Sequence, residues 1–183
     1  MRCLDNNKEL NEVKNKESSD VDSILLHENY LKLKQIAEGI MTDRYHYMKL
    51  KAPGFMDLVI EKIGDNRISL SHYYEQNGDL MADPDVEIIV DHNSETARAA
   101  TFQQDNMAIY QSAYNGDQLT DEYLAKELDD FLGDWLKNIK AQGHIPYKAY
   151  YSSGIMSQLN NVKFDEEGQE IVADIVEDDD LEM

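Results

Sequence analysis

The sequence predicts an α+β fold in which an antiparallel sheet of about five strands is flanked by two amphipathic helices. Two segments repeat apolar residues at steps of three and four, and five short segments are rich in β-branched and aromatic residues. The five segments are separated by short links that contain turn signals. Strands joined by short links pair antiparallel, because a parallel crossover needs a dozen or more residues.

The 183 residues divide by composition into three parts. Residues 1–20 are polar and of mixed charge, which predicts a flexible or marginally helical arm. Residues 21–164 are expected to form a single α+β domain. Residues 165–183 hold ten acidic and no basic side chains, a pattern typical of a disordered, solvated tail.

The first helix is predicted over the segment DVDSILLHENYLKLKQIAEGIM, with Asp22 or Ser23 as its N-cap. One face of this helix is apolar and is expected to pack on the core. It comprises Leu26, Tyr30, Leu33, Ala37 and Ile40.

Five strands are expected after this helix, over residues 55–63, 67–74, 85–92, 97–104 and 107–114. The first two form a hairpin through Gly64-Asp65-Asn66, and Asp105-Asn106 divides the last two. Residues 77–84 are predicted to be a loop in which Asn77-Gly78 makes the bend. Leu80 and Met81 are expected to help cover the core.

The second helix is predicted over DEYLAKELDDFLGDWLKNIKAQG, with Thr120 as its cap and Gly143 as its stop. Its apolar stripe includes Trp135, the only tryptophan, which is expected to be buried.

The charge is strongly acidic, with 17 Lys and Arg against 37 Asp and Glu, a net of −20. Without the predicted tail the net is still −10, so the expected domain is acidic as well. Such a chain repels nucleic acid and anionic membranes and attracts basic protein surfaces. Self-repulsion favours a monomer. The single Cys3 permits no internal disulfide and fits a reduced, cytoplasmic setting.

Metal binding and nuclease chemistry are two alternatives for the segment around Pro84. Asn77, Asp79, Asp83 and Asp85 offer oxygen ligands, but they lack the spacing of an EF-hand. Pro84-Asp85 resembles the first half of a nuclease signature, but no acid-x-Lys triplet follows it. No Walker loop, dinucleotide fingerprint or nucleophile elbow occurs. We therefore expect no enzyme and no cofactor.

The acids are better interpreted as a contact surface. Asp83, Asp85 and Glu87 alternate along one predicted strand, which would place them in a row on one face, resembling backbone phosphates. A second cluster is expected on the polar side of the second helix. The candidate partner-binding residues are Asp79, Asp83, Asp85, Glu87, Asp129, Asp130 and Asp134. The alternative for either cluster is a solvated face.

Three stretches carry a resemblance to known proteins: FMDL from residue 55, LSHYYEQNGDLMADP from residue 70, and YQ at residue 110. They resemble a small domain of unknown function found on conjugative elements and phages of Gram-positive bacteria. This resemblance covers roughly Leu26 to Trp135. In length and acidic tail, the chain as a whole is similar to type II-A anti-CRISPR proteins from gut Clostridium.

The second resemblance implies a non-catalytic inhibitor of CRISPR-Cas9 that acts in the cytoplasm of the bacterial host cell. Its partner would be the Cas9–guide RNA complex, which holds its heteroduplex in a positively charged channel and reads the PAM with arginines. Acidic surfaces bound there would hinder target DNA engagement or cleavage, without direct binding of DNA or membrane. The alternative is an accessory protein of a mobile genetic element that binds another basic partner.

Overall fold

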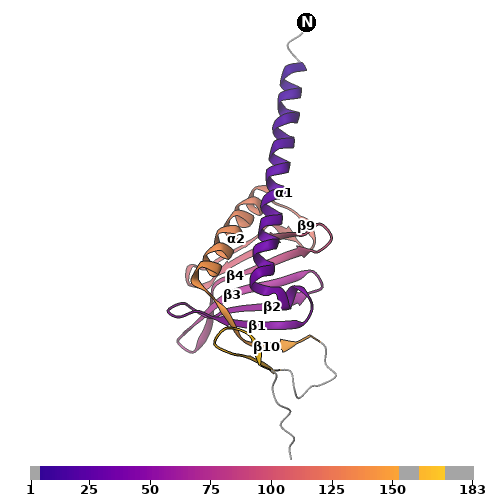
Figure 1. Ribbon diagram of the computed structural model, residues 1–183. Coiled ribbons are helices and arrows are strands. Elements are labelled where there is room, and N and C mark those ends of the chain that lie inside the picture. The colour runs from indigo at the N-terminus through magenta and orange to yellow at the C-terminus, as the bar shows by residue number, and fades with distance from the viewer. Residues whose placement is uncertain (1–4, 153–160, 172–183) are drawn as a thin grey trace, which may run out of the picture.

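A large antiparallel sheet covered on one face by two helices forms the protein (Figure 1). The computed structural model describes residues 5–152 and 161–171. The helices are α1 (Asp5–Met41) and α2 (Glu122–Gln142), and a short 3-10 turn, η1, spans Asp105–Met107. The strands are β1 (Tyr45–Lys51), β2 (Leu58–Gly64), β3 (Arg67–Gln76), β4 (Asp79–Asp91), β5 (Thr96–Ala99), β6 (Thr101–Gln104), β7 (Ile109–Ser112), β8 (Tyr114–Asn115), β9 (Gln118–Leu119), β10 (Ile145–Tyr151), β11 (Asn161–Phe164) and β12 (Glu170–Ile171).

The predicted α+β class with two helices and an antiparallel sheet is confirmed, but the expected number of strands is too low. The sheet has ten strands in the order β12-β11-β10-β1-β2-β3-β4-β6-β7, with β5 also pairing with β4. A separate pair, β8 and β9, lies off this sheet. The added strands include β1 and β10, which pair with each other and extend the sheet beyond β2.

The hairpin between β3 and β4 replaces most of the loop expected over residues 77–84. Only Asn77 and Gly78 separate the paired residues Gln76 and Asp79, and both have positive φ, of 57° and 89°. This is the two-residue hairpin turn that Asn-Gly favours, so the predicted bend is confirmed. The expectation for Leu80 is wrong, because its side chain is 68% exposed.

Helix α1 begins much earlier than the sequence indicated. It runs from Asp5 through the boundary expected after residue 20, so neither Asp22 nor Ser23 caps it. From Tyr30 onward the expected apolar face is buried, including Leu33 and Ile40.

Helix α2 has nearly the predicted limits. Its N-cap is Asp121, whose carboxylate accepts a hydrogen bond from the backbone N–H of Leu124 at 2.9 Å. The hydroxyl of Thr120, the predicted cap, donates instead to the carbonyl of Ala113. Gly143 ends the helix with a φ of 72°, as predicted. Trp135 is buried, also as predicted.

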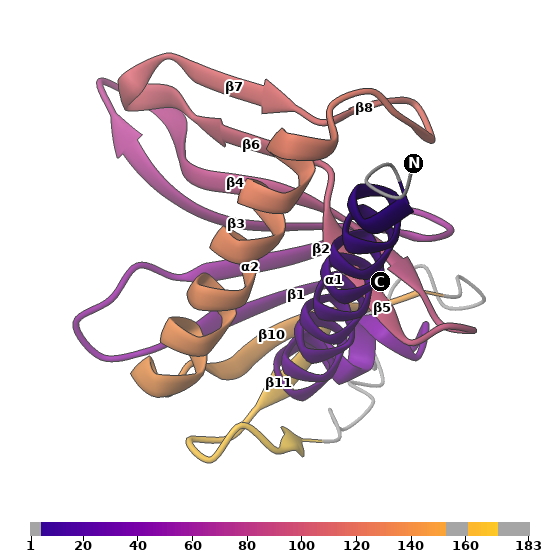
Figure 2. The same ribbon diagram turned by 90° about the horizontal axis from the view of Figure 1, so that it is seen from above.

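The two helices lie on the same face of the sheet, where they build the core (Figure 2). They approach each other closely at Asn29, whose amide donates to the backbone carbonyl of Asp129 at 3.0 Å. A Cβ at Gly133 would lie 2.8 Å from Oδ1 of Asn29, so α2 has room for α1 only because this residue is glycine. No described helix is long and apolar enough to cross a membrane.

The last described residues form a small hairpin at the edge of the sheet. β11 and β12 pair through Lys163↔Ile171 and Phe164↔Glu170, around a turn in which Asp165 accepts backbone hydrogen bonds from Glu167 and Gln169. The tail expected from residue 165 is therefore ordered as far as residue 171. The rest of that expected tail, residues 172–183, lies outside the described residues.

Candidate functional site

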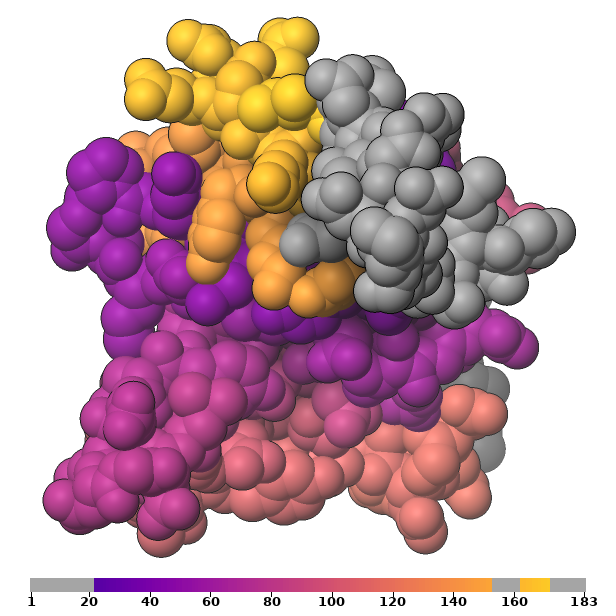
Figure 3. Space-filling model, turned by 90° about the horizontal axis from the view of Figure 1, so that it is seen from below, coloured from indigo at the N-terminus to yellow at the C-terminus, as the bar shows by residue number. Residues whose placement is uncertain are grey.

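The face of the sheet opposite the helices, here called the outer face, is the face that neither described helix covers. Figure 3 views the molecule from the side away from the helices and shows strands from several parts of the chain side by side. Residues that pair across neighbouring antiparallel strands point to the same face. The pairings therefore fix which side chains the outer face presents.

Three carboxylates lie together on the β2–β4 part of this face, and we call Glu61, Asp85 and Glu87 the acidic half. Glu61 and Glu87 flank Ser69 in one cross-strand row, so their Cα atoms are about 10 Å apart. All three carboxylates line a shallow depression of about 220 Å³ together with Ser69 and Tyr73. That volume is below the few hundred Å³ of most small-molecule sites, which favours a macromolecular contact.

The three carboxylates differ in the partners that they already have within the protein. Asp85 accepts hydrogen bonds from the hydroxyls of Ser69, at 2.9 Å, and Tyr73, at 3.0 Å. Glu87 forms an ion pair of 3.5 Å with Arg67 and is 39% exposed, and Glu61 is exposed. Glu61 is therefore the most available to a cationic partner. Asp85 keeps its negative charge because its two partners are neutral hydroxyls, and Arg67 partly balances the charge of Glu87.

The structure separates Asp83 from Asp85 and Glu87, so the expected row of these three acids is wrong. Between the pairs Ser71↔Asp85 and Tyr73↔Ala82, β4 has one more residue than β3. Such a bulge reverses the alternation of side chains along the strand. Asp83 thus points toward the helix side.

The partner of Asp83 supports this assignment. Its carboxylate accepts a hydrogen bond of 2.7 Å from the amide of Gln104. Gln104 neighbours Gln103 in β6, and Gln103 pairs with Asp85 on the outer face. Adjacent residues of a strand face opposite ways, so Gln104 and Asp83 share the other face. Asp79 lies at the exposed tip of the same hairpin.

The cluster expected on α2 is also only partly on the surface, because Asp129 is buried. Its side chain is 4% exposed and accepts the backbone N–H of Ala99 at 2.8 Å, with Nε of Arg98 at 3.6 Å. Burial raises the pKa of Asp129 to about 6, in spite of the hydrogen bond from Ala99 and the charge of Arg98. Asp129 is thus a structural residue, whereas Asp130 and Asp134 are exposed on the helix layer.

The oxygen ligands that the sequence offers for a metal ion do not converge. Asp83 and Asp85 lie on opposite faces, and Asn77 and Asp79 lie at the hairpin tip. Within the described part of the chain, no three His, Cys, Asp or Glu side chains are grouped to hold a metal ion.

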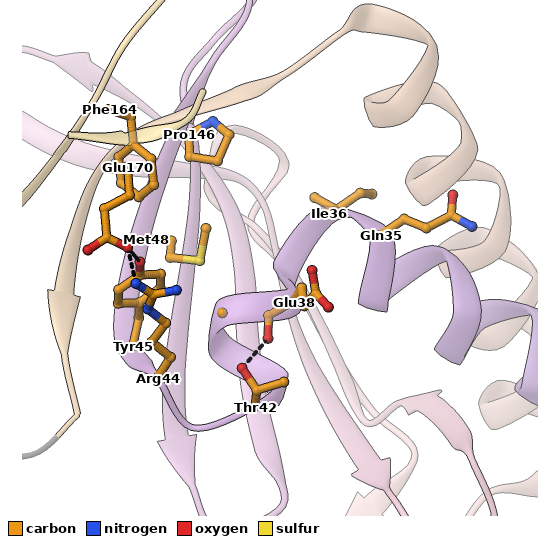
Figure 4. A pocket seen from close by; sticks show the side chains of 11 residues that line it. Gln35, Ile36, Glu38, Thr42, Arg44, Tyr45, Met48, Pro146, Phe164 and Glu170 are labelled. Carbon is orange, nitrogen blue, oxygen red and sulfur yellow. Dashed lines mark hydrogen bonds and ion pairs between the residues drawn. The ribbon is translucent and has the colours of Figure 1, made fainter. Parts of the chain in front are cut away.

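A larger pocket of about 500 Å³ lies between the end of α1 and strands β1, β10, β11 and β12 (Figure 4). One of its two glutamates, Glu170, accepts hydrogen bonds from Tyr45 at 2.7 Å and Tyr151 at 2.6 Å, and pairs with Arg44. Burial would raise the pKa of Glu170, but these hydrogen bonds and the charge of Arg44 together hold it below its usual value. Because every one of these bonds ties β12 to β1 or its neighbours, we assign Glu170 an anchoring role.

Sequence reasoning missed Glu61 as a surface residue of the site. The signal was present in LVIEKI, where Leu58 and Ile60 are buried and Val59 and Glu61 take the alternate positions. Its position next to Glu87, however, depends on the register of three strands, which the sequence does not display.

Comparison with known proteins places the chain in a family. Residues 28–145, or 118 of the 183 residues, match the model described as "Domain of unknown function (DUF6908)". The matched range includes the acidic half and both faces of the β3–β4 hairpin. No curated protein and no solved structure matches the chain.

Proposed function

Because the chain belongs to the DUF6908 family, whose description assigns no activity, we propose its function from its surface: it is a non-catalytic protein that binds a basic partner. The partner we propose is a Cas9–guide RNA complex in a bacterial host cell, whose engagement or cleavage of target DNA the protein hinders. The proposed contact is the outer face of the sheet, centred on the acidic half.

The observation that carries this proposal is a sheet face that neither described helix covers, with three carboxylates, in a chain of net charge −20. Both helices cover the other face, so the outer face is not needed for the core (Figure 2). A long-range negative potential guides such a protein to a positively charged channel, and carboxylates placed at a regular strand spacing pair with Arg and Lys there.

The identity of the partner rests on the resemblance to type II-A anti-CRISPR proteins. The most specific part of the family resemblance, Ser71–Pro84, forms the end of β3, the turn and the start of β4. This segment borders the acidic half, since Asp85 follows it directly. It carries the resemblance to the domain of unknown function, whereas the resemblance to anti-CRISPR proteins lies in the length and the acidic tail of the whole chain.

The alternative function is an accessory role on a mobile genetic element, with a basic replication or transfer protein as partner. The same acidic half would serve it. The resemblance of β2–β4 to a domain of conjugative elements and phages favours this alternative.

The test is a titration of the protein into a Cas9–guide complex with labelled target DNA, at two salt concentrations. We expect DNA to be displaced near one-to-one, with a weaker effect at the higher salt, because salt screens exposed charges. Binding without displacement would move the inhibited step to cleavage. No binding to the complex would reject the Cas9 proposal and leave the accessory role. Activity at catalytic amounts, abolished by a chelator, would reject a non-catalytic function.

A further inference from the structure

Three lysines stand in one row across the other part of the outer face. Lys49 of β1 pairs with Lys148 of β10, and Lys148 pairs with Lys163 of β11. Neighbouring strands are about 4.8 Å apart, so the Cα atoms of the three lysines lie within a span of about 10 Å. Like charges directly opposite each other destabilise a sheet, so this row is costly for the fold.

Within the described residues, only one lysine of this row has a carboxylate partner. Lys49 has a carboxylate partner, Asp57, at 3.1 Å. Among the described residues, no carboxylate oxygen lies within 4.0 Å of the ammonium group of Lys148 or Lys163. The described part of the chain thus leaves two neighbouring lysines available to a ligand of the opposite sign.

Tyrosine rings lie beside the lysines on the same strands. The rings of Tyr47 and Tyr150 are paired across β1 and β10, with centroids 5.4 Å apart. The ammonium group of Lys148 lies 5.0 Å from the centroid of Tyr150, and that of Lys51 lies 5.5 Å from the centroid of Tyr147. We call Tyr47, Lys49, Lys51, Tyr147, Lys148, Tyr150 and Lys163 the lysine–tyrosine patch.

We propose that the lysine–tyrosine patch binds single-stranded nucleic acid. Ammonium groups neutralise phosphates, and tyrosine rings on an open sheet provide stacking surfaces for unpaired bases. The net charge of −20 opposes any nucleic acid, single-stranded or duplex, so the local charge of the patch has to outweigh this repulsion. A duplex offers phosphates but no free base faces for the rings to stack on. An acidic peptide would use the lysines and leave the rings without a role. The inference does not rest on the proposed function, because it concerns a different half of the face.

The test measures anisotropy of fluorescein-labelled U12 and dT12 with the full chain in about 50 mM salt. We expect saturable binding that weakens with salt. The variant Lys148→Gln/Lys163→Gln should raise Kd about tenfold and reduce the slope of log Kd against log salt by about 1.4, or about 0.7 for each phosphate that is no longer neutralised. The matched control is Lys137→Gln/Lys140→Gln on α2, which removes the same charge elsewhere and should change Kd less than about twofold.

The rings are tested separately at Tyr150. Tyr150→Leu should raise Kd about fivefold or more with an unchanged salt slope, while Tyr150→Phe, which keeps the ring, should bind as the wild type does. Melting curves establish that each variant is folded. The proposal is overturned if neither oligonucleotide binds at about 100 µM protein, if the α2 control weakens binding as much, or if polyglutamate competes as well as U12. Since no Cas9 is present, failure here leaves the proposed function untouched.

Discussion

Asp83 and Asp85 are two residues apart in one strand, yet their carboxylates lie on opposite faces of the sheet. Gln104 binds the first on the helix side, while Ser69 and Tyr73 bind the second on the outer face. The extra residue of β4 at this point reverses the alternation, and it divides the acids of the hairpin into two groups with different surroundings. Only the second group belongs to the proposed contact.

Removing charge from the acidic half should weaken inhibition. The variant Glu61→Lys/Glu87→Gln changes the charge by three units on the outer face, and we expect the protein concentration for half-displacement of target DNA to rise about tenfold. Its matched control, Asp130→Lys/Asp134→Asn, changes the charge equally on the helix layer and should have a smaller effect. A stronger effect from the control would move the proposed interface to α2.

Gly39→Ala should destabilise the fold although alanine favours helices. A Cβ at Gly39 would lie 2.3 Å and 2.5 Å from two ring atoms of Tyr45, a buried side chain that Glu170 holds by a hydrogen bond. Overpacking of this kind costs about 1–3 kcal/mol, more than the roughly 1 kcal/mol of helix propensity gained. Urea denaturation measures the resulting drop in unfolding free energy.

The cause of that drop can be checked with a second substitution. In a Tyr45→Leu background the ring atoms are gone, so Gly39→Ala should cost clearly less than in the wild type. An equal cost in both backgrounds would show that the clash with Tyr45 is not responsible.

Asp129 should make the protein less stable as pH rises from about 4 to about 6. Burial raises its pKa from 3.8 to about 6, so in this range the folded chain holds a proton that the unfolded chain has released. Stability therefore falls as pH rises through this window, by up to about 3 kcal/mol. Asp129→Asn keeps an acceptor for Ala99 but does not titrate.

The measurement is the difference in unfolding free energy between the wild type and Asp129→Asn at several pH values. Other carboxylates contribute equally to both proteins and cancel. We expect the wild type to lose stability relative to the variant between pH 4 and 6, with no further change above about pH 7. A flat difference across this range would contradict the raised pKa.

The N-cap of α2 gives a prediction that separates two adjacent residues. Asp121→Ala should cost about 1 kcal/mol of unfolding free energy, because the N–H of Leu124 loses its acceptor. Asp121→Asn should restore most of this stability. If Asp121→Ala were neutral in urea denaturation, the cap would have to be reassigned, and Thr120 would be examined next.

The elements that the sequence predicted are those with a local signal. The apolar repeats of α1 and α2, the Asn77-Gly78 turn and the alternation of β2 and β3 all depend on neighbours within a few residues. Strands β1 and β10 were missed because each is completed by the other, about 100 residues away along the chain. The length of α1 was missed because its N-terminal half lacks an apolar face.

The candidate site was predicted less well, for two physical reasons. The alternation that grouped Asp83 with Asp85 holds only in a regular strand, and a one-residue bulge cannot be read from DLMADPDVE. Asp129 lies on α2 beside the exposed Asp130, and its burial comes from α1 and β5 packing against it. Both errors come from tertiary contacts.

Positive and negative charge are separated across the outer face, with the lysine–tyrosine patch on one side and the acidic half on the other. Along one cross-strand path the chain presents Lys163, Lys148 and Lys49, then Val59 and Ser71, and then Asp85. Such a face is an in-plane dipole, and an approaching molecule with its own charge gradient experiences a torque before it touches. Only one in-plane rotation matches positive to negative at both ends, so a partner would arrive already turned toward its bound orientation.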